Sequence, residues 1–106
     1  MKNLDSNSFE REIAEDPRPA LVDFWSPTCQ PCQQLMPELE QLEQHYGERV
    51  RFFKVNTAEN RRLAAKQQVL GLPTVAIYAG GEKKVQLSGE VSRERLEAEL
   101  VRHLEV

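Results

Sequence analysis

Short runs of apolar residues alternate along this chain with segments in which apolar residues recur every third or fourth position. The run 20–25 is almost continuously apolar, which is typical of a central strand covered on both faces, and 50–55 and 75–78 predict further strands. Helical spacing is clearest in a stripe made of Leu35, Leu39, Leu42 and Tyr46. The pattern therefore predicts a fold in which strands and helices alternate.

Residues that cap or break helices mark the ends of the elements in the first half. Residues 2–5 are expected to form a short edge strand, and Asp5 or Ser6 to cap a helix that the prolines of 16–19 end. The helix 32–46 should kink at Pro37 and end at Gly47.

The second half carries similar signals. Asn56 and Thr57 are expected to cap a short helix, 58–67. The stretch 71–74 breaks the chain before the strand 75–78, and Gly80-Gly81 predicts a tight turn into a strand over 84–88. Ser92 should cap a last helix, which carries leucines at 96, 100 and 104.

The expected order is β-α-β-α-β-α-β-β-α, in one domain over residues 1–106. Its first part can form parallel strand pairs through right-handed crossovers, whereas the last two strands must be antiparallel. The fold class is therefore α/β, with a mixed central sheet and helices on both faces. In such sheets the reactive site lies beyond the carboxyl end of a central strand.

Composition narrows the class of protein further. The 106 residues are 40% hydrophobic and 29% charged, which is ordinary for a globular domain. The net charge of −3 gives no reason to expect nucleic acid or an anionic membrane as partner, and no apolar run approaches ~20 residues. We see no signal peptide and no strong dimer signal, so we expect a cytoplasmic monomer.

The two cysteines, Cys29 and Cys32, lie between the expected central strand and the next helix. A thiol attacks only as thiolate, and the free N–H groups at a helix start favour a negative sulfur. We therefore expect Cys29 to be the attacking sulfur and Cys32, one turn further in, to be more buried and to resolve the mixed disulfide. Pro31 suits the first helical turn.

Two other interpretations of the pair are a zinc site and a structural core. Zinc needs about four ligands, and there is no second CxxC or CxxH motif, while His45 and His103 lie on polar helical stretches. Polar neighbours at 28, 30 and 33 argue against the interpretation that both cysteines are buried in a core without water. We expect no metal and no bound cofactor.

Asp23 interrupts the apolar run 20–25 and shares a strand face with Leu21 and Trp25 if the alternation holds. It could point to solvent, as most aspartates do. We expect it to be buried, because a buried carboxyl has a raised pKa and can exchange protons near neutrality. Lys54, on the neighbouring strand, could be its partner or could simply be solvated.

Several motifs together resemble the thioredoxin family over the whole chain. They are Val22-Asp23-Phe24-Trp25, Cys29-Gln30-Pro31-Cys32, the mid-helix Pro37, Lys54 and Gly71-Leu72-Pro73-Thr74. The resemblance implies the thioredoxin fold, a sheet of about five strands flanked by four helices. It also implies that Asp23 exchanges a proton with Cys32 and that Lys54 tunes it.

For substrate binding, the resemblance implies that Pro73 is a cis-proline opposite the disulfide and that Leu72 offers backbone groups to an extended substrate segment. Gly89 would line the binding groove and leave room for the substrate. Trp25, Thr28, Gln30 and Pro31 would surround the cysteines. An ordinary trans turn proline is the alternative for Pro73.

The chain departs from the family pattern at three positions. Thr28 stands where a second tryptophan is common, and Gln30 where glycine usually lies between the cysteines. Gln30 bears on thiolate stability and hence on reduction potential. Thr57 stands where the family often has aspartate, and we expect the threonine still to cap the helix.

The leading functional hypothesis is a thiol–disulfide oxidoreductase that reduces protein disulfides through the Cys29–Cys32 couple. By resemblance, a flavoprotein disulfide reductase of the thioredoxin reductase type would supply electrons, and oxidised target proteins would accept them. Alternatives are an atypical member with a dedicated partner or an oxidant role, and a non-catalytic binding module.

Overall fold

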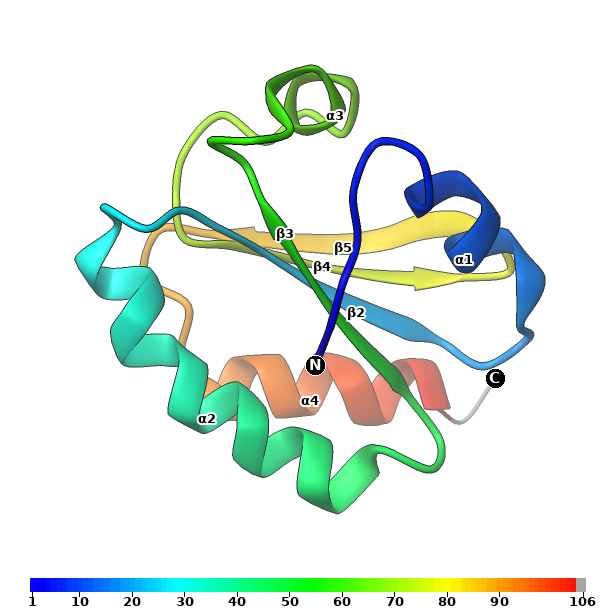
Figure 1. Ribbon diagram of the computed structural model, residues 1–106. Coiled ribbons are helices and arrows are strands. Elements are labelled where there is room, and N and C mark those ends of the chain that lie inside the picture. Colours follow the sequence, from blue (N-terminus) through cyan, green and yellow to red (C-terminus); the bar gives the residue numbers. More distant parts are fainter. Residues whose placement is uncertain (105–106) are drawn as a thin grey trace.

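The computed structural model describes residues 1–104 and confirms the predicted order of elements. Figure 1 labels these elements. They are β1 (Lys2–Asn3), α1 (Phe9–Glu15), β2 (Ala20–Trp25), α2 (Gln30–Tyr46), β3 (Arg51–Asn56), α3 (Arg61–Lys66), β4 (Thr74–Ala79), β5 (Glu82–Ser88) and α4 (Arg93–Leu104).

Within the described residues, five strands form one mixed sheet in the order β1-β3-β2-β4-β5. β3 runs parallel to both β1 and β2, whereas β4 is antiparallel to both β2 and β5. The prediction that the apolar run forms the central strand is confirmed, and so is the short edge strand at the N-terminus. The β4–β5 hairpin turns at Gly80 and Gly81, whose φ angles of 62° and 80° suit a two-residue turn.

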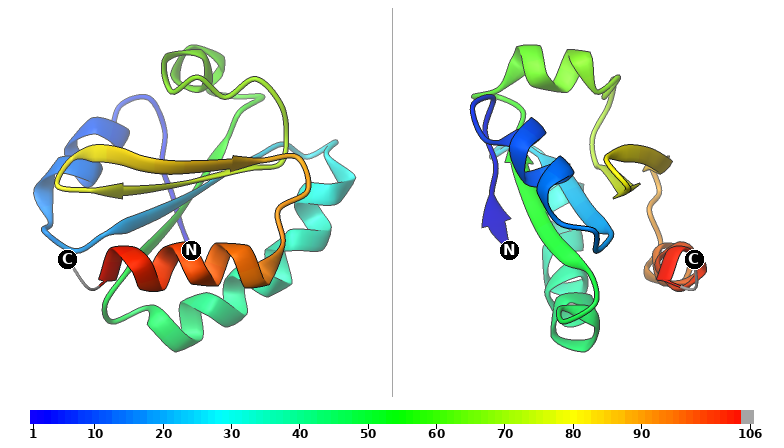
Figure 2. Two further views of the ribbon diagram at one scale, coloured as in Figure 1. Left: turned by 180° about the vertical axis from the view of Figure 1, so that it is seen from behind. Right: turned by 90° about the vertical axis from the view of Figure 1, so that its right-hand side faces the viewer.

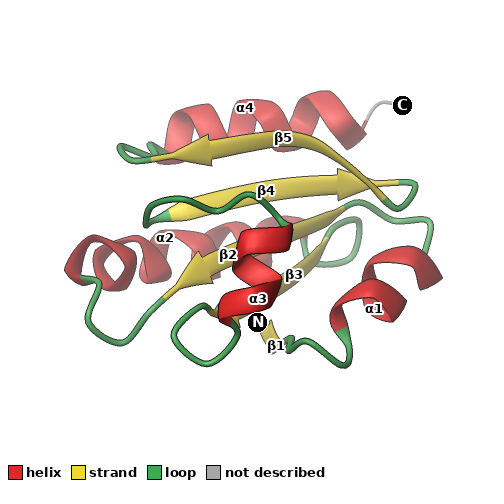
Figure 3. Ribbon diagram, turned by 90° about the horizontal axis from the view of Figure 1, so that it is seen from above, coloured by secondary structure: helices red, strands yellow, loops and turns green. Residues whose placement is uncertain are grey.

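Helices cover both faces of the sheet: α2 and α4 lie on one face, and α1 and α3 on the other (Figures 1 and 3). Alternation along β2 matches this arrangement. Leu21 packs into the cluster on the α2 and α4 side, while Val22 and Phe24 pack with residues of α1 and α3. Each face of the central strand is therefore buried in its own core.

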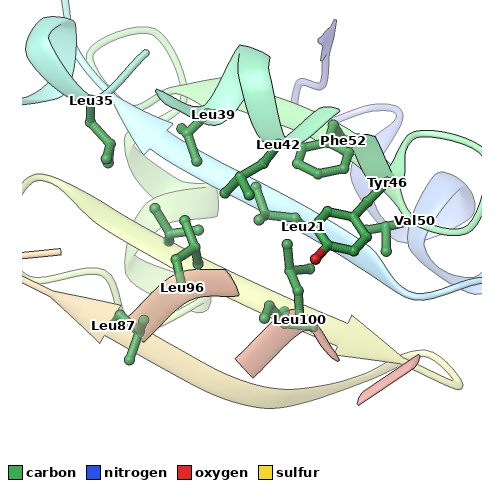
Figure 4. Close-up of a cluster of buried hydrophobic side chains, with 12 residues drawn as sticks. Leu21, Leu35, Leu39, Leu42, Tyr46, Val50, Phe52, Leu87, Leu96 and Leu100 are labelled. Carbon is green, nitrogen blue, oxygen red and sulfur yellow. The ribbon is translucent and has the colours of Figure 1, made fainter. Parts of the chain in front are cut away.

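The core on the α2 side fixes the helix that carries the cysteines. Leu39 and Leu42 of α2 and Leu96 and Leu100 of α4 point toward one another and are at most 1% exposed (Figure 4). Burying one such side chain stabilises a fold by about 1.5–3 kcal/mol. Tyr46 Oη also donates to Glu97 Oε2 at 2.6 Å, which ties the end of α2 to α4.

The first helix begins later than predicted. The Asp5 carboxylate accepts hydrogen bonds from the N–H groups of Asn7 and Ser8, at 2.9 and 3.0 Å. These bonds organise a turn ahead of α1, which starts only at Phe9 with Ser8 as its N-cap. Asp5 therefore caps a turn that leads into the helix.

The third helix shows the same correction. Asn56 Oδ1 accepts from the Ala58 N–H at 3.0 Å, and α3 begins at Arg61 after a turn. The expected capping role of Thr57 is wrong, because its hydroxyl donates to the Trp25 carbonyl oxygen at 3.1 Å. This residue joins the ends of β3 and β2 instead.

Helix α2 continues through Pro37, so this proline does not end it. The helix ends at Gly47, as predicted. Gly47 keeps a right-handed conformation with φ of −61°. A Cβ atom at this position would lie 2.5 Å from the Glu43 carbonyl oxygen. Glycine at position 47 is thus explained by the close approach of the Glu43 backbone, and not by a left-handed conformation.

Candidate active site

The cysteine pair lies where β2 ends and α2 begins, at the carboxyl end of the central strand (Figure 1). Cys29 and Cys32 form a disulfide with an S–S distance of 2.15 Å and a Cα–Cα distance of 5.3 Å. Cys32 is 1% exposed, whereas Cys29 is partly exposed. The expected difference in burial between the two sulfurs is confirmed.

Cys29 is the N-cap residue of α2, and its sulfur accepts a hydrogen bond from the Cys32 N–H at 3.2 Å. The positive end of the helix dipole acts on the same sulfur. Both features favour negative charge on Cys29, so the site is built to hold a thiolate there once the disulfide is reduced.

Two hydrogen bonds hold the loop ahead of the cysteines. Gln33 Nε2 donates to the Pro27 carbonyl oxygen at 2.8 Å, and the Cys29 N–H donates to the Ser26 carbonyl oxygen at 3.2 Å. Sequence reasoning missed this role of Gln33, because a glutamine after a helix start carries no signal for a contact six residues back.

Asp23 is fully buried, as predicted, and shares the α2 side of β2 with Leu21. Within residues 1–104, neither carboxyl oxygen of Asp23 has a hydrogen-bond partner. Burial raises the pKa of this carboxyl to about 7, while the positive charge of Lys54 acts in the opposite direction. A group with this pKa exists in both protonation states at neutral pH.

Lys54 lies opposite Asp23 in the register of β2 and β3. Its Nζ lies 5.8 Å from the centre of the Trp25 ring, within reach of a cation–π interaction. Lys54, Trp25 and Cys32 line one pocket of about 330 Å³, together with Gln33 and Met36. The structure thus places Lys54 beside the buried cysteine.

The Leu72–Pro73 peptide bond is cis, as the resemblance implied. Leu72, Pro73, Pro31 and Gly89 line a groove of about 550 Å³ next to the cysteine pair. The Gly89 N–H donates to the Pro73 carbonyl oxygen at 3.1 Å, which joins two walls of the groove.

Thr74 supports the same wall and was not singled out from the sequence. Its hydroxyl donates to the Gly71 carbonyl oxygen at 2.6 Å and lies 3.0 Å from Ser88 Oγ. Gly89 has a φ angle of 79°, and a Cβ added there would meet no atom within 4 Å. The left-handed backbone conformation therefore explains glycine at 89, since the surrounding space alone would admit a Cβ atom.

The groove includes only part of the expected substrate-binding set. Thr28 and Gln30 are exposed on the loop and at the first position of α2, outside the residues that line the groove. Trp25 lies on the other side, in the pocket with Lys54. The predicted residues therefore surround the disulfide from two sides.

Comparison with known proteins decides the family. The family model named Thioredoxin matches residues 1–102. The chain belongs to the thioredoxin family. It is 50% identical over 90 residues to a thioredoxin of Acetoanaerobium sticklandii, covering 85% of this chain and 86% of the relative. With a thioredoxin of Peptoclostridium acidaminophilum it shares 39% identity over 102 residues, 95% of this chain and 93% of the relative.

The fold agrees with this assignment to the thioredoxin family. The structure of a mutant thioredoxin from Halobacterium salinarum superposes with a TM-score of 0.90. It covers 99% of this chain and 91% of its own, at 24% sequence identity. With its CxxC pair, this thioredoxin-family chain is a thiol–disulfide oxidoreductase, and its enzymatic class is protein-disulfide reductase.

Two further findings concern residues 1–104. No group of three or more His, Cys, Asp or Glu side chains is arranged there to hold a metal ion. Among the described helices, none has both the length and the apolar character needed to cross a membrane.

Proposed function

We propose that this protein reduces disulfides of target proteins, with Cys29 as attacking sulfur and Cys32 as resolving sulfur. The Cys29 thiolate attacks one sulfur of the target disulfide, and the other target sulfur leaves as a thiolate. Cys32 then attacks Cys29 Sγ and releases the second target thiolate. Two electrons pass to the target, and the protein becomes the disulfide.

One observation carries this assignment of roles. Cys29 is partly exposed at the N-cap of α2 with an N–H on its sulfur, whereas Cys32 is buried behind it. A target sulfur can reach Cys29 from solvent, whereas the buried Cys32 reaches only the neighbouring Cys29 Sγ, which it attacks once the mixed disulfide has formed. This geometry favours a fixed order of attack.

Asp23 serves in this proposal as the group that takes the proton of the Cys32 thiol when Cys32 attacks. Its carboxyl has no competing hydrogen-bond partner within residues 1–104, and burial raises its pKa to about 7. Lys54 tunes the same carboxyl through its positive charge, which favours the ionised form. The tuning role is supported by the register, which sets Lys54 opposite Asp23, and by the pocket that Lys54 shares with Cys32.

Targets bind across the groove as an extended segment. Within residues 1–104, the Leu72 N–H and carbonyl groups have no hydrogen-bond partner, so they are free to pair with such a segment. Pro31, Pro73 and Gly89 form its walls. Trp25, Thr28 and Gln30 contact the target around the cysteine pair.

Thioredoxin-family proteins generally take electrons from thioredoxin reductase and pass them to target proteins. We propose that a flavoprotein disulfide reductase of this type reduces the Cys29–Cys32 disulfide. No bound cofactor is needed, because the two sulfurs carry both electrons. We further propose that the protein acts as a monomer in the cytoplasm.

The test is dithiol-driven reduction of a protein disulfide by wild type, Cys29→Ser and Cys32→Ser. We expect activity to vanish in Cys29→Ser, since no attacking sulfur remains. Cys32→Ser should trap mixed disulfides with the target, visible as a mass increase that dithiothreitol reverses. Wild-type activity no higher than that of either variant would contradict the proposal and favour a binding module.

The direction of electron flow is tested separately. Redox titration against glutathione gives the potential of the Cys29–Cys32 couple. A potential more reducing than the glutathione pool supports the reductase role. A clearly more oxidising value would support an oxidant.

A further inference from the structure

The groove beside the disulfide carries two carboxylates and no basic side chain. Glu38 comes from α2 and Glu90 from the connection between β5 and α4. The complete lining is Pro31, Gln34, Leu35, Glu38, Leu72, Pro73, Gly89, Glu90 and Val91. Pro31 directly precedes Cys32, so this end of the groove lies beside the disulfide, and Glu38 lies further along α2.

The two acidic segments lie side by side although they are far apart in sequence. In Figures 1 and 2, the orange connection between β5 and α4 runs next to the cyan first half of α2. Residues of both segments line the same groove, which places the two segments close together in depth as well. A bound segment that leaves the disulfide along the groove therefore passes both carboxylates.

Neither carboxylate is neutralised by the protein. Glu38 and Glu90 are exposed, and within residues 1–104 neither accepts a hydrogen bond nor forms an ion pair. The basic residue nearest in sequence to Glu90 is Arg93, but its guanidinium donates to Gln41 and lines a different pocket. The negative charge of the groove is therefore available to a ligand.

The rest of the groove suits a long side chain with a charged end. Leu35 is 5% exposed, and Leu72 and Val91 are half-buried, so the floor is apolar. Lysine and arginine lay their aliphatic stems on apolar surface and keep the charged group at the rim. An apolar floor below two carboxylates is a better match for a lysine or arginine side chain than for an acidic or a short polar side chain.

We propose that this groove selects target disulfides with a lysine or arginine in the flanking segment, bound by Glu38 and Glu90. The inference rests on the function proposed above and names the class of target that the site prefers. The reaction is unchanged: Cys29 and Cys32 still pass two electrons to the target disulfide. The carboxylates act only by holding the target segment, so they are specificity residues and take no part in the chemistry.

The expected preference is modest and depends on salt. An exposed ion pair contributes little, so two such pairs should favour a basic target about threefold to tenfold in kcat/KM at low salt. Because exposed charges are screened over about 10 Å at 0.1 M salt, the preference should shrink as salt is added.

The experiment compares oxidised peptides that are identical except at one position, which lies one to four residues from a cysteine. This position holds Lys, Gln or Glu. Fully reduced protein is mixed with each peptide at 20 mM and at 500 mM salt, chosen as roughly low and high screening. Rates are normalised to the rate of each peptide with dithiothreitol, which removes intrinsic differences in reactivity. The double variant Glu38→Gln, Glu90→Gln tests the groove.

A second double variant, Glu40→Gln with Glu94→Gln, is the matched control. Both residues are exposed and outside the groove, and the change in net charge is the same. We expect the Lys preference in wild type and in this control, and its loss in the groove variant. Equal rates for Lys and Gln peptides in wild type, or equal loss of preference in both double variants, would overturn the inference. If no peptide is reduced at all, the proposed function fails instead.

Discussion

At the level of single residues, we expect the carboxyl of Asp23 to give the site its response to pH. It is fully buried on the α2 side of β2 and lacks a hydrogen-bond donor within residues 1–104. Burial therefore raises its pKa to about 7, and the charge of Lys54 limits the rise. Below this pH the carboxyl is protonated and cannot accept the proton of Cys32.

Asp23→Asn removes this proton acceptor while preserving the shape of the side chain. We expect the reduction of a protein disulfide near neutral pH to slow by about tenfold or more, because a positioned general base contributes at least this much. The step in the pH–rate profile near 7 should disappear. Single-turnover rates from pH 5.5 to 8.5, chosen as about 1.5 pH units to either side of that pKa, measure both effects.

Lys54→Gln provides the matched comparison. Without the positive charge, the pKa of Asp23 should rise, so the inflection of the pH–rate profile should move to higher pH. If the pH–rate profile of Asp23→Asn overlays that of wild type, the proposed proton role of Asp23 is contradicted. If the inflection in Lys54→Gln does not move, the proposed tuning role of Lys54 is contradicted.

At the level of single elements, the end of α3 contains a backbone conformation that its sequence does not favour. Gln68 has a φ angle of 62°, in the left-handed region. Its N–H donates to the Ala65 carbonyl oxygen at 3.0 Å, and the Val69 N–H donates to that of Ala64 at 2.9 Å. These two bonds form a Schellman motif, in which the left-handed position is usually glycine.

Gln68→Gly should therefore stabilise the fold. A side chain in the left-handed conformation costs about 1–2 kcal/mol, part of which glycine loses again as chain entropy. We expect the free energy of unfolding to rise by about 0.5–1 kcal/mol, seen as a higher urea midpoint with an unchanged slope. Gln68→Ala is the control, since alanine keeps the Cβ. A gain of equal size in both variants would refute the explanation.

The sequence predicted whole elements well and their first residues less well. The apolar run of β2 and the leucine stripe of α2 were correct, because burial on fixed faces demands those patterns. Asp5 and Asn56 were expected to start helices, but their carboxyl and amide oxygens organise turns ahead of them. Asn and Asp stabilise either arrangement, so residue type alone does not separate the two.

At the scale of the whole molecule, the site combines a local part and an assembled part. The cysteine pair and Asp23 come from one stretch, β2 to α2, and could be predicted from it. The groove draws on three distant segments, represented by Pro31, Pro73 and Gly89. Only the chain topology brings Glu38 and Glu90 into that groove, which is why sequence reasoning did not find them.

The cost of burying Asp23 should appear in the stability of the entire fold. From about pH 4 to 7 the folded protein keeps this proton, whereas the unfolded chain, in which the carboxyl has its ordinary pKa of 3.8, loses it. The native state thus binds more protons than the unfolded state, so Asp23 lowers the free energy of unfolding as pH rises through this window. Above pH 7 the loss is complete, on the order of 4 kcal/mol.

Asp23→Asn should abolish this loss. Asp5, Glu10 and Glu12, whose pKa values are lowered by hydrogen bonds, act with the opposite sign but equally in both proteins. The difference in unfolding free energy between variant and wild type therefore isolates Asp23. We expect it to grow in favour of the variant from pH 4 to 8, measured by urea unfolding of the disulfide form, in which no thiol titrates. A difference that stays constant over this range would show that Asp23 is ionised in the folded protein throughout.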